Sequence, residues 1–217
     1  MEREKAMKNR IHTVIFDLDG TLSNSAIITM AAFKAVVPAY GLPVPTKEAV
    51  QKATGYPNPE FYYLLFPDHP KEKINEIGEL VEQEELKVLP AVSHELLFDG
   101  CRELLERLAE SGIRLRIAST GDEGHVVSVL RETGIIDYFD MLCYEQPDKV
   151  KMLRDMTQDG EKDGFVMIGD MKKDYEGARA NGILSVGVCY GYCIKESTDF
   201  DIYIDSPMEL LDVLNIQ

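Results

Sequence analysis

Two carboxylates one residue apart follow an apolar stretch near the start of the chain. Residues 11–16 are mostly apolar and rich in β-branched side chains, which predicts a buried central strand, and Asp17-Leu18-Asp19-Gly20-Thr21 comes directly after it. Because two acids at the end of a buried strand repel each other, they need a cation between them or a proton on one of them. Gly20 lets the backbone turn sharply, and Thr21 offers its hydroxyl and N–H to an anion. A metal ion, a carboxylate nucleophile and a phosphate group could therefore share one small site here.

By itself, this stretch also fits a polar Asp-Gly turn at a strand end. The interpretation therefore depends on polar residues that follow other predicted strands. These are Ser119, Thr120 and Gly121 after one strand, and Asp170 after another, with Asp174 one helical turn farther on and Lys149 at the start of the preceding helix. The carboxyl ends of parallel strands meet at one edge of a sheet, so we expect these side chains to lie together. A separate turn or helix cap could explain each residue alone, but their shared position favours a catalytic site.

The elements that must position these residues alternate between strand and helix from residue 98 onward. Predicted strands cover residues 113–118, 138–144, 165–168, 184–188 and 202–204, and predicted helices cover 102–111, 123–133, 149–156, 174–180 and 207–214. This alternation is typical of a doubly wound parallel sheet in an α/β fold. We expect residues 1–23 and 94–217 to form this core.

Residues 24–93 have helical patterns and no convincing strand. Predicted helices cover residues 25–40, 47–54 and 70–89, and Asn58-Pro59 opens a further one. We expect these residues to form an all-helical cap domain inserted between the first strand and the rest of the core.

Composition limits the classes of partner. The chain has 217 residues, 45% of them hydrophobic, and a formal net charge of −15, which disfavours nucleic acid and anionic membranes. No signal-like or membrane-length apolar run is present, so we expect a cytoplasmic location. The cysteines and histidines lack the spacing of a zinc or redox site, which predicts reduced thiols and no histidine metal centre. The cysteines are Cys101, Cys143, Cys189 and Cys193, and the histidines are His12, His69, His94 and His125.

The combined motifs resemble those of the haloacid dehalogenase-like hydrolase superfamily. Asp17-Leu-Asp19-Gly-Thr-Leu is similar to its first motif, Ser119 to its second, Lys149 to its third and Gly169-Asp170-Met-Lys-Lys-Asp174 to its fourth. The resemblance implies a Rossmann-like core in which Asp17 attacks phosphorus and becomes an aspartyl-phosphate, while Asp19 acts as acid and base.

The same resemblance implies a Mg²⁺ site and a phosphate site. Mg²⁺ would bind Asp17, Asp170 and the carbonyl of Asp19, and Asp174 would belong to the metal site by orienting metal-bound water or Lys149. Ser119 and Lys149 would hold the phosphoryl oxygens, although Lys151 competes with Lys149 for this role. Gly20, Thr21, Thr120 and Gly121 are further candidates for binding the substrate.

The position of the helical insert resembles that of the helical-cap subgroup. Thr54-Gly55-Tyr56-Pro57 is similar to the substrate-facing turn of phosphoglycolate phosphatase-like and β-phosphoglucomutase-like members, which makes Gly55 and Tyr56 candidates for substrate contact. Asn24 replaces a common aspartate of this subgroup, and Asp99 replaces a common proline.

The resemblance implies Mg²⁺-dependent hydrolysis of a small phosphorylated metabolite by a monomer or homodimer. A sugar-phosphate mutase with the same core chemistry is the alternative, since the two differ in whether the cap excludes water. Asp19 argues against a dehalogenase, which needs no acid there, and against a phosphonatase, for which no cap lysine stands out. A signalling receiver domain uses similar residue types but lacks a helical insert.

Overall fold

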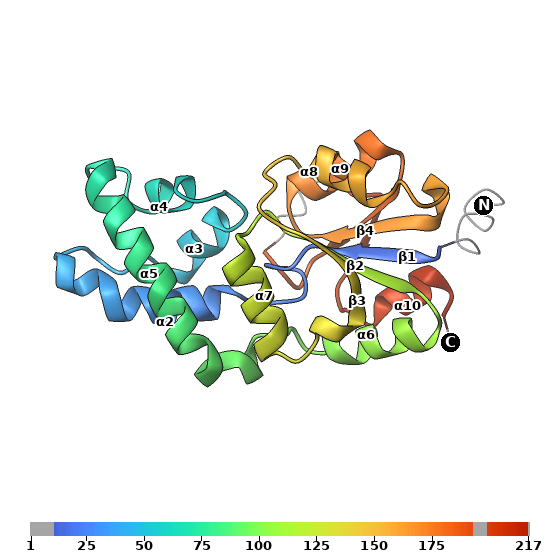
Figure 1. The fold of residues 1–217 in the computed structure, drawn as a ribbon, viewed down its shortest axis with the longest axis horizontal. Coiled ribbons are helices and arrows are strands. Elements are labelled where there is room, and N and C mark those ends of the chain that lie inside the picture. Colours follow the sequence, from blue (N-terminus) through green and yellow to red (C-terminus); the bar gives the residue numbers. More distant parts are fainter. Residues whose placement is uncertain (1–10, 193–198, 217) are drawn as a thin grey trace.

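The computed structural model describes residues 11–192 and 199–216, and within them six parallel strands form one sheet in the order β3-β2-β1-β4-β5-β6. The strand that carries Asp17 at its end is β1, and it lies in the middle of the sheet (Figure 1). This arrangement confirms the predicted α/β fold with a doubly wound parallel sheet. The strands are β1 (Thr13–Phe16), β2 (Arg114–Ala118), β3 (Phe139–Cys143), β4 (Phe165–Gly169), β5 (Leu184–Val188) and β6 (Ile202–Ile204).

Helices cover both faces of the sheet (Figure 1). Side chains of β1 point alternately to the two faces, so Val14 and Phe16 join one hydrophobic cluster while Ile15 joins the other. The cluster around Phe16 includes residues of α6 (Cys101–Glu110), α7 (Glu123–Glu132) and α10 (Glu209–Leu214). The cluster around Ile15 includes residues of α8 (Lys149–Met156) and α9 (Lys172–Asn181).

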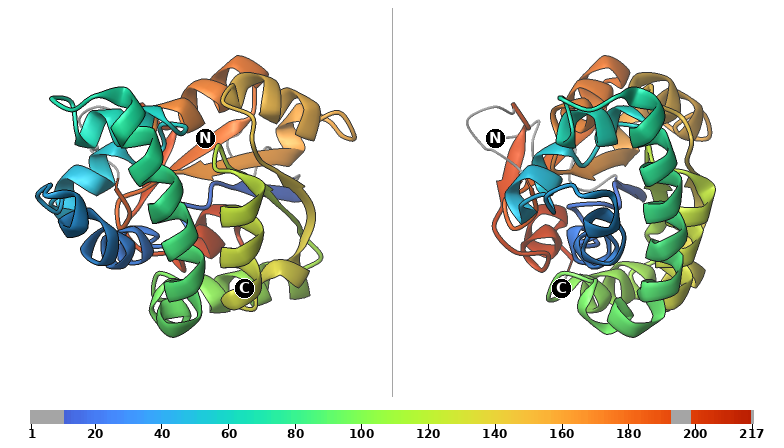
Figure 2. Two further views of the ribbon diagram at one scale, coloured as in Figure 1. Left: turned by 60° about the vertical axis from the view of Figure 1, so that its left-hand side comes forward. Right: turned by 90° about the vertical axis from the view of Figure 1, so that its left-hand side faces the viewer.

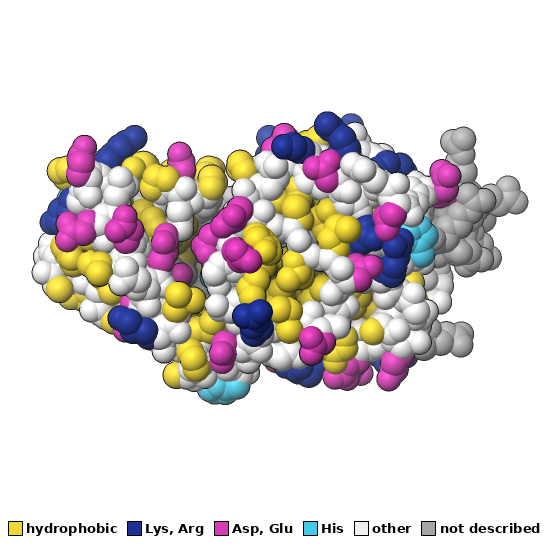
Figure 3. Space-filling model, in the orientation of Figure 1, with side chains coloured by type: hydrophobic (Ala, Val, Ile, Leu, Met, Phe, Trp, Pro, Cys, Tyr) yellow, Lys and Arg dark blue, Asp and Glu magenta, His cyan; other side chains and the backbone are white. Residues whose placement is uncertain are grey.

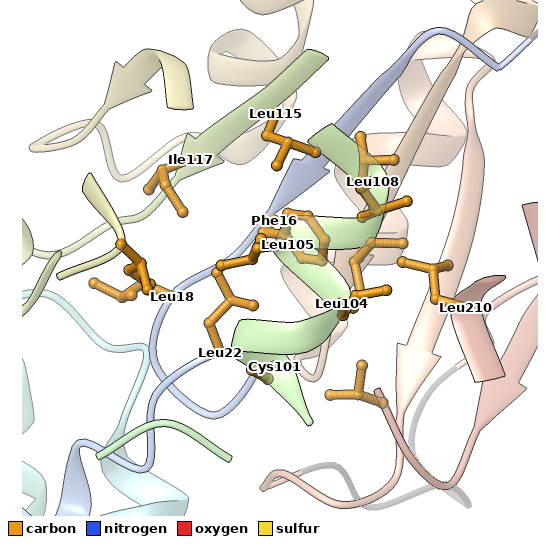
Figure 4. Packing of buried hydrophobic residues seen from close by; sticks show 14 of the residues in the cluster. Phe16, Leu18, Leu22, Cys101, Leu104, Leu105, Leu108, Leu115, Ile117 and Leu210 are labelled. Atoms are coloured by element: carbon orange, nitrogen blue, oxygen red, sulfur yellow. The ribbon is translucent and has the colours of Figure 1, made fainter. Parts of the chain in front are cut away.

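The cluster around Phe16 also holds the loop that follows β1. Leu18 and Leu22, which flank the Asp19-Gly20-Thr21 turn, are fully buried and belong to the same cluster as Phe16 and leucines of α6 (Figure 4). Burying each leucine stabilises the fold by about 1.5–3 kcal/mol. Two apolar anchors therefore hold the polar turn between them against the sheet edge.

Residues between β1 and α6 form a helical layer beside the sheet, on the left of Figure 1 and turned forward in Figure 2. Its own hydrophobic cluster includes Phe33, Val50, Tyr62, Ile74 and Ile77. The insert therefore has a hydrophobic cluster of its own, although Ile28 of α2 and Leu89 of α5 belong to the cluster around Phe16. It consists of α2 (Ala26–Val36), a 3-10 turn (Val37–Tyr40), α3 (Lys47–Ala53), α4 (Glu60–Leu65), α5 (Lys71–Val92) and a 3-10 turn (Ser93–Glu95).

Two helix boundaries in the insert differ from the sequence prediction. The prediction ends the long helix at Leu89, but α5 continues through Pro90 to Val92, because a proline removes one backbone donor without preventing a helix from continuing. The predicted helix over 25–40 becomes α2 followed by a 3-10 turn that contains Pro38. Helix α9 also begins at Lys172, two residues before its predicted start.

The remaining predictions concern cysteines and membranes. Cys101 and Cys143 are free thiols, while Cys193 and residues 1–10 of the predicted core lie outside the described residues. In the part of the chain that the structure describes, no helix combines the length and the apolar character required to cross a membrane.

Candidate active site

Three buried carboxylates meet at the carboxyl edge of the sheet. Asp17 follows β1, Asp170 follows β4, and Asp174 lies in the first turn of α9. Pairing of Phe16 with Ile168 places the ends of β1 and β4 side by side, and the backbone N–H of Asp17 donates to the carbonyl of Ile168 at 2.8 Å. Each of the three acids offers a carboxylate oxygen within 4.8 Å of the others.

Lys149 lies among these acids. Its Nζ is 2.8 Å from Oδ1 of Asp17 and 3.0 Å from Oδ1 of Asp174, and it also donates to the carbonyl of Ala118. Burial lowers the pKa of Lys149, but the two carboxylates outweigh burial and raise it above the ordinary value. The structure places Lys149 beside Asp17, whereas Lys151 is exposed. Asp174 contacts Lys149 directly, and its Oδ2 also accepts from the backbone N–H of Met171 at 3.0 Å.

The acids carry more negative charge than Lys149 neutralises. Burial and the nearby Asp174 raise the pKa of Asp17 to about 6, although Lys149 opposes this shift. Burial, with Asp17 and Asp174 close by, raises the pKa of Asp170 well above its ordinary value. Carboxylate oxygens are the ligands that Mg²⁺ prefers, and a divalent cation here would relieve the repulsion. The donor set and its electrostatics therefore fit Mg²⁺.

Gly20 and Thr21 contact Asp170 rather than line the cavity described below. Gly20 has a φ of +84°, and a Cβ added there would lie 2.4 Å from Oδ2 of Asp170, so glycine is required by both conformation and space. The hydroxyl of Thr21 is 3.4 Å from Oδ1 of Asp170, and the backbone N–H of Tyr192 donates to Oδ2 at 3.2 Å. These contacts orient Asp170, and binding of phosphate by Gly20 or Thr21 stays a prediction.

Asp19 has a partner that sequence analysis missed. Nε2 of His125, in the first turn of α7, lies 2.8 Å from Oδ1 of Asp19. Burial opposes ionisation of both groups, but their mutual attraction wins, since it lowers the pKa of Asp19 and raises that of His125 to about 10. The available signal was position: His125 lies six residues after Ser119, on the helix that leaves the same strand end.

Ser119 and its neighbours form another part of the site. The hydroxyl of Ser119 is buried and accepts a hydrogen bond from the backbone N–H of Gly121 at 3.1 Å. The hydroxyl of Thr120 lies 2.5 Å from Nζ of Lys173, a second residue that sequence analysis missed although it belongs to the fourth motif. Burial lowers the pKa of Lys173. Lys173 also donates to the carbonyl of Gly55 at 2.9 Å, which joins the insert to the core.

A cavity of about 470 Å³ lies between the insert and the sheet edge. Asp17, Asp19 and Ser119 line its core side, and the turn from Thr54 to Pro57 lines its insert side. Tyr56 is 53% exposed, so its side chain is not packed in the core of the insert. The structure therefore brings Gly55 and Tyr56 to the same cavity as the catalytic candidates.

The fold and this site define the class of protein. The chain belongs to the haloacid dehalogenase-like hydrolase family, whose model matches residues 14–188. The superfamily that the sequence motifs predict is thereby confirmed.

Particular relatives carry different names. A protein named tyrosine-protein kinase PtkA from Mycobacterium tuberculosis is 30% identical over 82% of this chain and 62% of its own length. The chain therefore spans less than two thirds of that relative. A phosphoglycolate phosphatase from Vibrio vulnificus is 27% identical over 95% of this chain and 97% of its own. Among solved structures, a haloacid dehalogenase-like hydrolase from Streptococcus pneumoniae superposes with a TM-score of 0.80 at 25% identity, covering 94% of this chain and 98% of the other.

Proposed function

We propose that this protein is a Mg²⁺-dependent phosphatase that hydrolyses small phosphomonoesters through an aspartyl-phosphate on Asp17. The observation that carries this proposal is the position of the Asp17 carboxylate, which reaches the cavity while contacting Lys149 and lying beside Asp170 and Asp174. A nucleophile, a charge-stabilising ammonium and carboxylates suited to a divalent cation are therefore combined at one end of a substrate-sized space.

In the first half of the reaction, a carboxylate oxygen of Asp17 forms a bond to phosphorus as the bond from phosphorus to the leaving alcohol breaks. Mg²⁺, held by Asp17, Asp170 and the carbonyl of Asp19, would lower the repulsion between the nucleophile and the phosphate. Lys149 offsets charge that develops on the phosphoryl oxygens, and Ser119 binds one of them. Asp174 holds Lys149 in place through the 3.0 Å ion pair.

Asp19 protonates the leaving oxygen in this step and then removes a proton from a water molecule. The oxygen of this water bonds to phosphorus as the bond from phosphorus to Asp17 breaks, which restores the Asp17 carboxylate and releases phosphate. The low pKa of Asp19 keeps its side chain ionised while it is paired with His125. Before the reaction, His125 therefore carries the proton, which reaches the leaving oxygen through Asp19.

The test is a panel of phosphorylated metabolites assayed with Mg²⁺ for both release of phosphate and isomerisation. A phosphatase releases phosphate in step with loss of substrate, and an Asp17→Asn control releases none. Isomerised sugar phosphate without released phosphate would favour the mutase alternative. No turnover of any ester, including para-nitrophenyl phosphate, would contradict the proposal.

The proposal includes the setting in which the protein acts. Its partner is a small phosphorylated metabolite rather than nucleic acid or a membrane, which the net charge of −15 supports. A cytoplasmic location and a monomeric or homodimeric state stay predictions.

A further inference from the structure

Outside the catalytic candidates, the wall of the cavity is acidic. Two of its acids, Glu82 and Glu85, lie one turn apart on α5 of the insert, and two others belong to the core. The core acids are Asp122, just before α7, and Glu145, just after β3. Carboxylates from both the insert and the core therefore line this cavity.

Neutral donors hold the two insert acids in place. Oε1 of Glu85 accepts a hydrogen bond from the hydroxyl of Thr29 at 2.6 Å, and Oε1 of Glu82 accepts one from the side-chain amide of Asn58 at 2.6 Å. Such donors fix a carboxylate without cancelling its charge. Burial and neighbouring acids raise the pKa of both glutamates, although the charge of His125 opposes the shift of Glu85.

Among the described residues, fewer cations than acids line the cavity. Among the described residues that line it, the positively charged groups are Lys173 and His125. Lys173 lies at the phosphate end, where it contacts Thr120 and the carbonyl of Gly55. His125 forms its closest ion pair with Asp19, and its charge also acts on Glu85. The wall of Glu82, Glu85, Asp122 and Glu145 therefore remains net negative.

The acidic wall continues into a second cavity. This space of about 340 Å³ lies along α5 and α7, shares Glu82, Glu85 and Asp122 with the first, and adds Glu79. Figure 3 shows acidic side chains on both sides of the hollow between the insert and the core. Acidic side chains thus line both cavities, which also share His125.

We propose, on the basis of the proposed function, that the natural ester carries a positively charged amine in its leaving group and that Glu82 and Glu85 receive this amine. An ammonium would form charge-assisted hydrogen bonds with the carboxylate oxygens of these two glutamates. A carboxylate in the same place would meet like charges in a space partly shielded from water, and the wall would reject it. Phosphoglycolate, the compound in the name of the Vibrio vulnificus relative, has a leaving group of this disfavoured kind.

Three esters with two-carbon leaving groups isolate the effect of charge. They are 2-aminoethyl phosphate, 2-hydroxyethyl phosphate and phosphoglycolate, which end in an amine, a hydroxyl and a carboxylate. We expect kcat/KM of the wild-type protein with Mg²⁺ to be at least about tenfold higher for the amine than for the hydroxyl, and lowest for the carboxylate, since one favourable charge contact is worth that much.

Variants then locate the effect. Glu82→Gln and Glu85→Gln should each lower the ratio of kcat/KM for the amine ester to that for phosphoglycolate by about tenfold. Glu72→Gln removes the same charge from an exposed position of α5 that lines neither cavity, and it should keep the wild-type ratio.

The outcomes separate this inference from the proposed function. Turnover of para-nitrophenyl phosphate in the same preparation shows that the phosphatase chemistry is present. If that ester is turned over while the hydroxyl or carboxylate ester equals the amine ester, the inference is wrong and the proposed function stands. An unchanged ratio in both Glu82→Gln and Glu85→Gln would also overturn it. Because the wild-type series needs no variant, misfolding of either one leaves the test intact.

Discussion

The two sides of the cavity hold their carboxylates in different ways. On the core side, Asp17 and Asp174 share Lys149 at 2.8 and 3.0 Å, and Asp170 lies close enough to hold a cation with them. On the insert side, Glu82 and Glu85 accept hydrogen bonds from uncharged groups. The core side therefore pairs carboxylates with a cation, whereas the insert side holds its carboxylates through uncharged donors.

This difference separates chemistry from selection. Every phosphomonoester presents the same phosphoryl group to the core, so a change there should affect all esters alike. In the proposed function the leaving group, which differs between esters, faces the insert. A change in the insert should therefore alter the order of the esters by kcat/KM. The predictions below use this contrast, beginning with the largest expected effect.

Asp17→Asn should remove turnover of every ester, by at least about 10³-fold, because an amide is a far poorer nucleophile than a carboxylate. The fold should persist, and without Mg²⁺ at pH 8 the melting temperature should not fall, since the raised pKa of Asp17 shows that its charge is unfavourable there. Steady-state kinetics and thermal denaturation measure both. Activity within tenfold of wild type would exclude Asp17 as the nucleophile.

Removal of metal by EDTA should stop turnover, and Mg²⁺ should restore it. Mg²⁺ should also raise the melting temperature of the wild-type protein, because it binds the folded carboxylates and relieves their repulsion. Asp170→Asn should shift both responses to at least about tenfold higher Mg²⁺. A variant whose melting temperature responds to Mg²⁺ as the wild type does would place the metal away from Asp170.

Asp19→Asn should lower kcat by about 10²–10⁴-fold for all esters, because it removes the acid and base but keeps the backbone carbonyl. Its Mg²⁺-dependent rise in melting temperature should therefore resemble that of the wild type. A loss of the Mg²⁺ response in Asp19→Asn, together with a normal response in Asp170→Asn, would reverse the roles given to these residues.

His125→Gln should lower kcat by about 10–100-fold, because it removes both the group that holds the proton of the pair and the partner that orients Asp19. The ion pair also gives a pH signature. Because folding raises the pKa of His125 from 6.5 to about 10, the stability from this pairing is fully present below about pH 6.5 and is lost as the pH rises through about 10. The gap in melting temperature between wild type and His125→Gln should shrink over that range. A gap that is constant with pH would show that the pair does not depend on the charge of His125.

The sequence was sufficient to predict the strand-end residues of the core. Asp17, Ser119 and Asp170 each follow an apolar run, and parallel strands bring such ends together whatever their order. The order of the strands itself depends on which crossover packs against which face, which no local pattern encodes. The position of Pro90 inside α5 could not be predicted locally either, because proline by itself favours the end of a helix.

Cavity residues that lie on helices were harder to predict from the sequence. His125 and Lys173 reach the cavity from the first turns of α7 and α9, where a side chain's direction depends on how each helix begins. Glu85 lies in a helix with many outward-facing glutamates, and only the packing of α5 against the core distinguishes it from them. The spacing of motifs along the sequence does not predict such contacts between the insert and the core.

The smallest expected effect concerns Gly55, on the insert side. Its φ of +98° disfavours other residues, and a Cβ there would lie 3.4 Å from Nζ of Lys173, at the flexible end of a side chain. Gly55→Leu should therefore cost about 1 kcal/mol of stability and reduce the space for the leaving group. We expect kcat/KM to fall several-fold more for esters with larger leaving groups than for acetyl phosphate.

A matched control separates backbone strain from loss of space. Gly41, also in the insert, has a φ of +69°, and a Cβ there would meet nothing within 4 Å. Gly41→Leu should lower the melting temperature about as much as Gly55→Leu, yet it should keep the wild-type order among esters, because it adds strain far from the cavity. If Gly55→Leu lowered kcat/KM equally for every ester, the turn would act on the core chemistry rather than on the leaving group. The contact between the carbonyl of Gly55 and Lys173 would then carry the effect. An altered order confined to Gly55→Leu would assign substrate selection to the insert.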